Sequence, residues 1–151
     1  MSGEAVIRPG VADDLPGLLA LYIQLHPQDP ALDLANARAI WDRMMTTAGL
    51  AVLVAVLPCG RVVATATVMV MPNLSRGGRP HAMIEDVVSD TAHRGQGHGR
   101  RVVQAAIQAA RQAGCHKVAL ATGRGDVAVH RFYEAAGLTA GGKTYFEARW
   151  P

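Results

Sequence analysis

The most informative stretch of the chain is Arg94-Gly95-Gln96-Gly97-His98-Gly99-Arg100. An apolar, strand-like run precedes it at residues 83–88, and an alanine- and glutamine-rich helix is predicted after it at residues 101–113. Closely spaced glycines let the backbone approach a ligand, and the start of a helix offers unpaired N–H groups at the positive end of its dipole. With its two flanking arginines, the stretch predicts a cradle for a diphosphate.

The size and composition of the chain indicate one folded domain, residues 1–151. Half of the 151 residues are hydrophobic and 18% are charged, which favours a packed core over disorder. No apolar run approaches the roughly 20 residues that span a bilayer, and residues 1–4 carry no secretory pattern, so no membrane association is expected. Cys59 and Cys115 lack metal-ligand spacing, so we expect free thiols in a cytoplasmic protein.

The charge pattern argues against nucleic-acid binding. The formal net charge is only +3, and Arg94, Arg100 and Arg101 gather at the glycine-rich stretch, where they can serve a single anionic ligand. A nucleic-acid-binding protein more often shows a wide basic face with interleaved aromatic residues, and only 5% of this chain is aromatic. No histidine or cysteine pair has metal-site spacing, so no metal is expected.

The pattern along the chain predicts alternating strands and helices. Asp13 or Asp14 caps the first helix, Asp33 caps the second, and Gly137 ends the last. A turn at residues 58–61 joins two runs rich in valine and alanine into a β-hairpin. The predicted strands are residues 6–8, 50–57, 62–71, 81–89, 117–121 and 143–149; the predicted helices end near residues 26, 48, 113 and 136. This order predicts an α/β (α+β) fold, with a mixed, mostly antiparallel sheet and helices on both faces.

Three motifs resemble the GCN5-related N-acetyltransferase (GNAT) family. The family's signature is Arg or Gln, two residues, Gly, one residue, then Gly or Ala, and residues 94–99 match it in full. Residues 130–138 resemble the family's pattern of Phe-Tyr, three residues, Gly and an apolar residue. Residues 84–88 and 114–118 are similar to glucosamine-6-phosphate acetyltransferases and their small bacterial relatives. The resemblance covers about residues 51–149.

The resemblance implies the GNAT fold and an enzyme that transfers acetyl from acetyl-CoA to an amine. In that fold the strand at residues 81–89 splays from the strand at residues 117–122, which leaves a wedge for the pantetheine arm. The residues implied to bind acetyl-CoA are Val87, Val88, Ser89, Arg94, Gly95, Gln96, Gly97, His98, Gly99, Arg100, Asp126 and Arg131. Two of them depart from the family, because Asp126 stands where many relatives carry Asn and Ser89 replaces an apolar residue.

Three residues are candidates for the proton transfers. Tyr133 is the candidate general acid, because a well-placed phenol can protonate the leaving CoA thiolate; the alternative is an aromatic residue that only packs its helix on the sheet. Glu85 and Asp86 are candidates for the base that accepts the amine proton. Neighbouring residues of a strand point to opposite faces, so we expect at most one of them in the substrate pocket and prefer Glu85. The alternative is that one pairs with an arginine and the other lies in solvent.

The sequence allows several interpretations of which ligand the protein binds. A dinucleotide-binding fingerprint is excluded because the third glycine comes one residue early and residues 115–122 contain no acid. We expect the acceptor to be a small primary amine, such as an amino sugar or its phosphate, and Arg76 and Arg79 are candidates to hold an anionic group unless they are merely solvated. The alternatives are a non-catalytic acetyl-CoA-binding sensor or interaction domain, and an acetyltransferase for a protein or aminoacyl-tRNA amine. The resemblance also implies a homodimer, with residues 143–149 at its interface.

Overall fold

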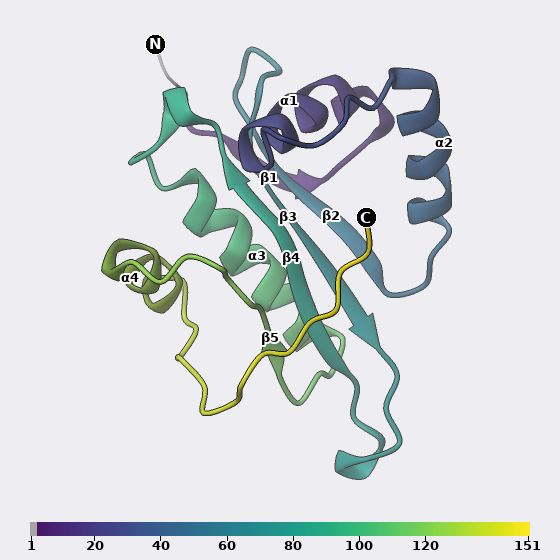
Figure 1. Ribbon diagram of the computed structural model, residues 1–151, viewed down its shortest axis with the longest axis vertical. Helices are drawn as coiled ribbons and strands as arrows, with labels where there is room; N and C mark the ends of the chain where they lie inside the picture. The colour runs from purple at the N-terminus through teal and green to yellow at the C-terminus, as the bar shows by residue number, and fades with distance from the viewer. Residues whose placement is uncertain (1–2) are drawn as a thin grey trace.

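A five-stranded sheet forms the centre of the molecule (Figure 1). The computed structural model describes residues 3–151, so Met1 and Ser2 of the N-terminal stretch discussed above lie outside it. The strands are β1 (Val6–Pro9), β2 (Leu50–Val56), β3 (Val62–Met71), β4 (His81–Ser89) and β5 (Val118–Ala119). The helices are α1 (Leu15–Leu25), α2 (Leu34–Met45), α3 (His98–Gln112) and α4 (Val127–Ala135). The predicted α/β class is confirmed.

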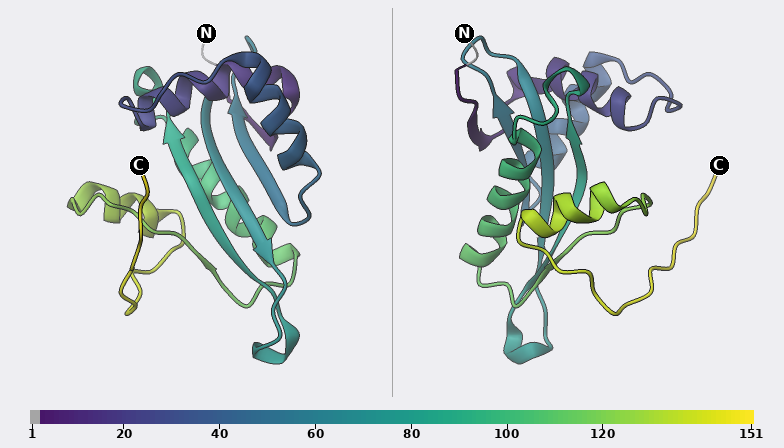
Figure 2. Two further views of the ribbon diagram at one scale, coloured as in Figure 1. Left: turned by 45° about the vertical axis from the view of Figure 1, so that its right-hand side comes forward. Right: turned by 90° about the vertical axis from the view of Figure 1, so that its left-hand side faces the viewer.

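The sheet follows chain order, β1-β2-β3-β4-β5. The first four strands are antiparallel, and β4 and β5 are parallel because α3 carries the chain back between them. The predicted hairpin of β2 and β3 is present, and Leu57 N donates to Arg61 O across its turn at 2.9 Å. Helices cover both faces, as predicted: α3 lies on one face, and α1 and α2 lie on the other (Figure 2).

The boundaries of several elements differ from the prediction. Asp33 caps α2 by accepting from Asn36 N at 2.9 Å, as expected, but the helix ends at Met45 instead of residue 48. Two threonine hydroxyls compete for carbonyls of its last turn, and Thr47 Oγ1 donates to Arg43 O at 2.8 Å. α3 begins three residues earlier than predicted, at His98, because Gly97 itself takes the N-cap position.

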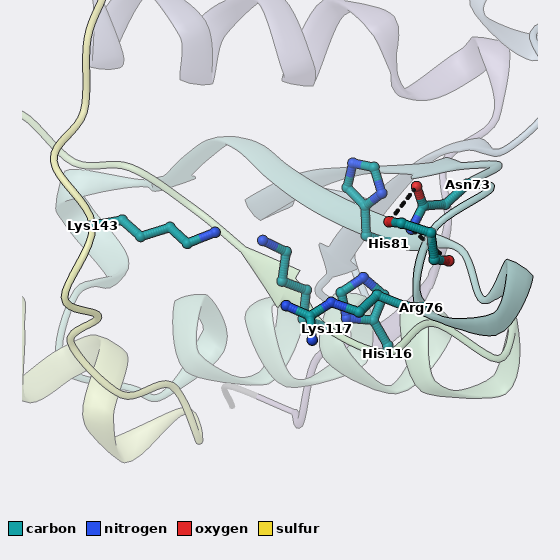
Figure 3. Close-up of a pocket in the computed structure, with 7 residues that line it drawn as sticks. Asn73, Arg76, His81, His116, Lys117 and Lys143 are labelled. Atoms are coloured by element: carbon teal, nitrogen blue, oxygen red, sulfur yellow. Dashed lines mark hydrogen bonds between the residues drawn. The ribbon is translucent and has the colours of Figure 1, made fainter.

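The strand predicted at residues 143–149 is wrong. After α4 the chain has no regular secondary structure, and it runs in front of the sheet toward α2 without packing on it (Figures 1 and 2). β5 has only two residues and therefore offers no edge on which another strand could form. Three side chains of the segment bond to one another, since Tyr145 and Arg149 both donate to Glu147. Lys143 extends from it toward Lys117 (Figure 3).

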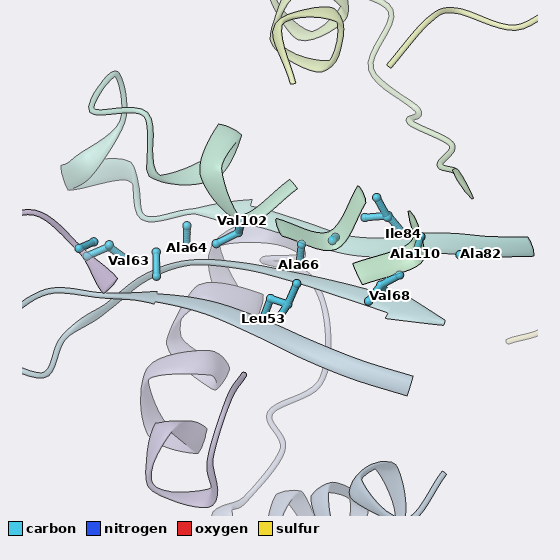
Figure 4. Packing of buried hydrophobic residues seen from close by; sticks show 12 residues of the cluster. Leu53, Val63, Ala64, Ala66, Val68, Ala82, Ile84, Val102 and Ala110 are labelled. Carbon is cyan, nitrogen blue, oxygen red and sulfur yellow. The ribbon is translucent and has the colours of Figure 1, made fainter. Parts of the chain in front are cut away.

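The hydrophobic core forms two layers, one on each face of the sheet. On the α3 face, Val102, Ala106 and Ala110 pack against alanines and valines of β2, β3 and β4 (Figure 4). The small side chains let the helix approach the sheet closely. On the other face, Leu15, Leu18 and Leu21 of α1 pack with Trp41 of α2. Within residues 3–151, no helix has the length and apolar character to cross a membrane.

Candidate active site

The outer edge of β4 is open over most of its length. β4 pairs with β5 only through Ala82–Val118 and Met83–Ala119, and the chain beyond β5 then diverges toward α4 (Figure 1). Residues 87–89 keep their pairing with β3 on the inner side, where Val88 lies opposite Thr65 and Ser89 opposite Ala64. The strand pair therefore splays as expected. Backbone groups at the outer edge of residues 87–89 lie along the resulting wedge.

A β-bulge interrupts β4 at Asp86. The register moves from Thr67–Glu85 to Thr65–Val88, so Asp86 and Val87 of β4 oppose the single residue Ala66 of β3, and Asp86 adopts a left-handed φ of 52°. Ile84 and Val87 pack on the α3 side of the sheet, whereas Val88 packs with the leucines of α1. The extra residue thus shifts the alternation of side chains by one position.

The bulge breaks the regular alternation from which Glu85 and Asp86 were expected to face opposite sides. Glu85 lies opposite Thr67, on the face of α1, and its charge acts on Tyr145 of the C-terminal segment. Asp86 is near α1 as well, because its negative charge helps to raise the pKa of Tyr22. Both carboxylates are exposed, and neither forms an ion pair with an arginine in the described part of the chain. Two exposed carboxylates therefore lie next to the wedge, Glu85 on the face of α1 and Asp86 at the bulge.

The glycine-rich stretch forms the N-terminus of α3 with its donors free. Gly97 is the N-cap, has a φ of 81°, and no side chain caps the helix. Gly95 has a φ of 76°, and a side chain at either glycine would meet open space. Within residues 3–151 no side chain bonds to the N–H groups of the first turn of this 15-residue helix, so they are available to an anion. The geometry fits a diphosphate.

Gly99 serves a different purpose from the two glycines before it. A Cβ atom at this position would collide with Ser89 Oγ and come within 3.3 Å of the Phe132 ring. The glycine therefore permits the start of α3 to pack against both the end of β4 and α4. This contact also accounts for Ser89, since the side chain at that position is directly against the backbone of α3.

The polar side chains of the loop divide into two groups. Arg94 and Arg100 are exposed, while Arg101 forms an ion pair with Glu4 at 3.3 Å. The His98 side chain is buried beneath the loop, with Nε2 3.2 Å from Gln96 Oε1, so only its backbone can face a ligand. Burial lowers the pKa of His98, helped by the charges of Arg101 and His93, and the ring stays neutral.

Asp90 anchors the start of the glycine-rich loop, a role that was not predicted from the sequence. Its carboxylate is 5% exposed and accepts from Arg61 Nη2 at 2.9 Å, Ala92 N at 3.1 Å and Gln24 Nε2 at 3.4 Å; His93 Nδ1 lies at 3.2 Å. Burial opposes ionisation, but these partners outweigh it and hold the pKa of Asp90 below its usual range. The signal available in the sequence was an aspartate at the position that caps the turn just before the glycines.

α4, which carries Tyr133, packs on α3 beyond the outer edge of β4 (Figure 1). Tyr133 is half-buried, and its ring meets Phe132 edge-on at a centroid distance of 5.0 Å. Burial raises the pKa of the phenol, and the charge of Arg124 opposes the rise. Asp126 stands at the N-cap of α4 without capping it and pairs with Arg124 at 3.4 Å, while Arg131 is exposed.

A basic pocket of about 220 Å³ lies at the opposite end of β4, between the β3–β4 hairpin tip and the start of β5 (Figure 3). It is lined by Asn73, Ser75, Arg76, His81, His116, Lys117 and Lys143. None of these residues is acidic. The mutual repulsion is visible in the pKa of Lys117, which the charge of Lys143 lowers. A pocket of this composition suits an anion.

The two arginines expected to hold an anionic acceptor have different environments. Arg76 lines the basic pocket, as the expectation requires. Arg79 instead donates to the carbonyls of Cys115 at 3.1 Å and Gly114 at 3.4 Å, just after α3. His116 and Lys117 belong to the third motif of the resemblance, but neither they nor Lys143 were expected to bind an anion, because they come from two segments far from the hairpin.

Comparisons with known proteins agree on one family. A model of the acetyltransferase (GNAT) family matches residues 18–138. A solved structure from Agrobacterium tumefaciens str. C58 is 48% identical, with a TM-score of 0.91, and the match covers 96% of this chain and 99% of that one.

Two curated relatives are glucosamine 6-phosphate N-acetyltransferases. The one from Trypanosoma brucei brucei is 39% identical over 83 residues, 55% of this chain and 54% of that protein, so the match spans about half of the relative's length. The first of two such proteins from Oryza sativa subsp. japonica is 39% identical over 119 residues, 77% of this chain and 72% of that protein.

Proposed function

Since this chain belongs to the acetyltransferase (GNAT) family, we propose that it transfers acetyl from acetyl-CoA to the primary amine of a small amino-sugar phosphate, by direct attack in a ternary complex. The observation that carries the choice of acceptor is the basic pocket, which opens beside the strand that presents Glu85. The names of the two curated relatives support the same acceptor class.

The donor would bind along β4 and the start of α3. The diphosphate would lie on the free N–H groups around Gly97, with Arg94 and Arg100 nearby, and the exposed Arg131 and Asp126 at the start of α4 are proposed contacts as well. The pantetheine amides would bond to the open backbone edge of residues 87–89. An N–H group at this edge would polarise the thioester carbonyl, a type of contact commonly worth about 3 kcal/mol to the transition state.

The reaction needs two proton transfers, which we assign to opposite sides of the wedge. The amine nitrogen forms a bond to the acetyl carbon, the carbon–sulfur bond breaks, and Glu85 accepts the proton that the amine loses, directly or through water. Tyr133 donates a proton to the departing thiolate. Because its pKa is raised, Tyr133 remains protonated at neutral pH and is available as a donor before each turnover.

The acceptor would span the distance between Glu85 and the basic pocket. His81, Met83 and Glu85 alternate with residues that pack against α3, so they share the face of α1. His81 and Glu85 are separated by about 13 Å along the strand. A hexose phosphate together with a long side chain such as Arg76 or Lys117 covers such a distance. The amine would then lie at Glu85 and the phosphate in the pocket.

The test is acetyl-CoA-dependent thiol release with glucosamine 6-phosphate, glucosamine and a panel of other small amines. We expect kcat/KM to be highest for the phosphate ester, and Arg76→Met to reduce the preference over glucosamine by about tenfold or more, since a charge-assisted hydrogen bond is lost. Arg111→Met, at an exposed arginine on α3, is the matched control. A protein that binds acetyl-CoA but acetylates no amine in the panel would instead support the sensor or a macromolecular acceptor.

We also propose a homodimer that uses the C-terminal segment, in a protein of the cytoplasm. Tyr145, Phe146 and Trp150 are 66%, 87% and 83% exposed, an unusual exposure for large apolar side chains that a partner would relieve. The unpaired thiols of Cys59 and Cys115 fit a reducing compartment. Sedimentation analysis should show a dimer that Phe146→Ser and Trp150→Ser weaken; a monomer at all concentrations would contradict it.

A further inference from the structure

A group of polar side chains beneath α1 has no role in the proposed donor site. Thr67 is 8% exposed, and its Oγ1 atom is buried without a hydrogen-bond partner in the described part of the chain. The neighbouring Thr65 hydroxyl is satisfied, because it donates to Leu53 O at 2.9 Å. An unpartnered buried hydroxyl costs free energy, which suggests that a ligand completes its surroundings.

Thr67 lies next to the proposed reaction centre. It is the direct cross-strand partner of Glu85, and such pairs have Cβ atoms about 5 Å apart on the same face of the sheet. The bulge then places Asp86 immediately beyond, with its backbone in the left-handed region. A residue other than glycine rarely adopts this conformation, and such strain concentrates at functional sites.

Tyr22 of α1 is close enough to both Thr67 and Asp86 for each to influence its pKa. α1 packs on both β3 and β4 (Figure 1). Tyr22 is partly buried and packs against the apolar cluster beneath this helix. Burial raises the pKa of Tyr22, the charge of Asp86 adds to the rise, and the adjacent hydroxyls of Thr67 and Thr65 oppose it. The phenol therefore keeps its proton, with the threonine hydroxyls adjacent to it and the Asp86 carboxylate within range of its charge.

We propose that Tyr22, Thr67 and Asp86 recognise a hydroxyl group of the acceptor, next to the amine that Glu85 deprotonates. The Thr67 hydroxyl donates to the Tyr22 oxygen after a small rotation, Tyr22 donates to the acceptor oxygen, and the acceptor hydroxyl donates to Asp86. Each group in this series of hydrogen bonds then has a partner, and the series ends at the Asp86 carboxylate. Tyr22 and Asp86 contact the acceptor, whereas Thr67 is a positioning residue for Tyr22.

The inference rests on the proposed function and specifies which group of the acceptor, besides its amine, is recognised. An amine without a neighbouring hydroxyl leaves both Tyr22 and Asp86 unpaired in a partly buried site, and sites built to bind a hydroxyl reject analogues that lack it. The acceptor is therefore a hydroxylated amine, and simple alkyl amines are excluded even when they carry a phosphate.

The experiment measures binding and turnover separately. Calorimetric titration of glucosamine 6-phosphate into the protein saturated with CoA gives the acceptor Kd, and thiol release gives kcat and KM. We expect Tyr22→Phe to weaken acceptor binding about tenfold, and Thr67→Val to weaken it by a smaller factor that Thr67→Ser restores. The KM for acetyl-CoA should not change. Thr139→Val, which removes a hydroxyl from an exposed site, is the matched control.

Deoxy analogues of glucosamine 6-phosphate identify which acceptor hydroxyl Tyr22 contacts. The effect of Tyr22→Phe should disappear for whichever of the 1-deoxy and 3-deoxy analogues lacks the recognised hydroxyl, while the wild-type protein binds that analogue more weakly. Thr67→Val should leave the Tm equal or higher, because it removes an unsatisfied buried hydroxyl. A Tyr22→Phe effect of equal size for both analogues and for the parent sugar would overturn the proposal.

The two proposals fail in different ways. Sugar binding that depends on Tyr22 but leads to no acetylation would refute the proposed function and leave this inference standing. Acetylation of glucosamine 6-phosphate with a Kd that neither Tyr22→Phe nor Thr67→Val changes would refute the inference alone. Absence of any binding of the hydroxylated amine also overturns it.

Discussion

Single side chains on two sides of the wedge are assigned opposite proton transfers. Tyr133→Phe removes one oxygen and keeps the half-buried ring that meets Phe132. We expect kcat to fall by about 10²–10⁴-fold, the usual contribution of a positioned acid, with little change in the KM for acetyl-CoA. Steady-state thiol release measures both constants. A kcat within threefold of the wild type would reduce Tyr133 to a packing residue.

The adjacent carboxylates of the bulge should have separable roles. Glu85→Gln is expected to lower kcat by about 10²–10⁴-fold at pH 7, because the amine then loses its proton without help. The deficit should shrink as pH rises, since more of the acceptor is already neutral. Asp86→Asn, which keeps a residue type that tolerates the left-handed region, should raise the acceptor KM more than it lowers kcat. Parallel pH profiles of the two variants test this assignment, and a larger kcat loss in Asp86→Asn would reverse it.

At the scale of secondary-structure elements, the contact between α3, β4 and α4 depends on the absence of a side chain at Gly99. Gly99→Ala would drive a methyl group into Ser89 and against Phe132. We expect about 1–3 kcal/mol of destabilisation from the overpacked contact, or roughly 2–4 °C in Tm for each kcal/mol.

Gly125→Ala is the matched control for this variant, since a Cβ atom there meets open space and the position has no left-handed φ. Thermal unfolding followed by circular dichroism measures both variants. Equal Tm values for the two would show that α3 can shift away from β4 at little cost.

Across the whole molecule, Asp90 joins segments that are distant in sequence. Its carboxylate accepts from Gln24 at the end of α1 and from Arg61 in the β2–β3 turn, and Gln24 also accepts from Thr91 N at 2.9 Å. Because the pKa of Asp90 is lowered on folding, its contribution to stability is present above the unfolded value near 4 and is lost as pH falls below it.

Asp90→Asn should therefore cost about 1–3 kcal/mol at pH 7 and should weaken the loss of stability between pH 5 and pH 3. Urea unfolding at the two pH limits measures the difference, with Asp29→Asn at an exposed site as the control. A variant whose stability falls with acid as steeply as that of the wild type would contradict the role assigned to Asp90.

Much of this protein was determined by the sequence alone. The hairpin, four helices, the central strand and the glycine-rich start of α3 were predicted, because each depends on contiguous residues: a turn, a cap, an apolar period, or a left-handed glycine. The same local signals carried the family resemblance. Gly97 illustrates why local signals suffice, since its left-handed φ and its position before a helix depend only on the neighbouring residues.

The tertiary structure decided what depends on pairing between distant segments. The bulge at Asp86 arises from the register of β4 on β3, and it breaks the alternation from which Glu85 and Asp86 were expected on opposite faces. The strand expected at residues 143–149 has no partner because β5 stops after two residues. The basic pocket and the surroundings of Thr67 each combine elements far apart in the chain. Such features are fixed by the balance of contacts across the whole sheet, and no local pattern of residues encodes that balance.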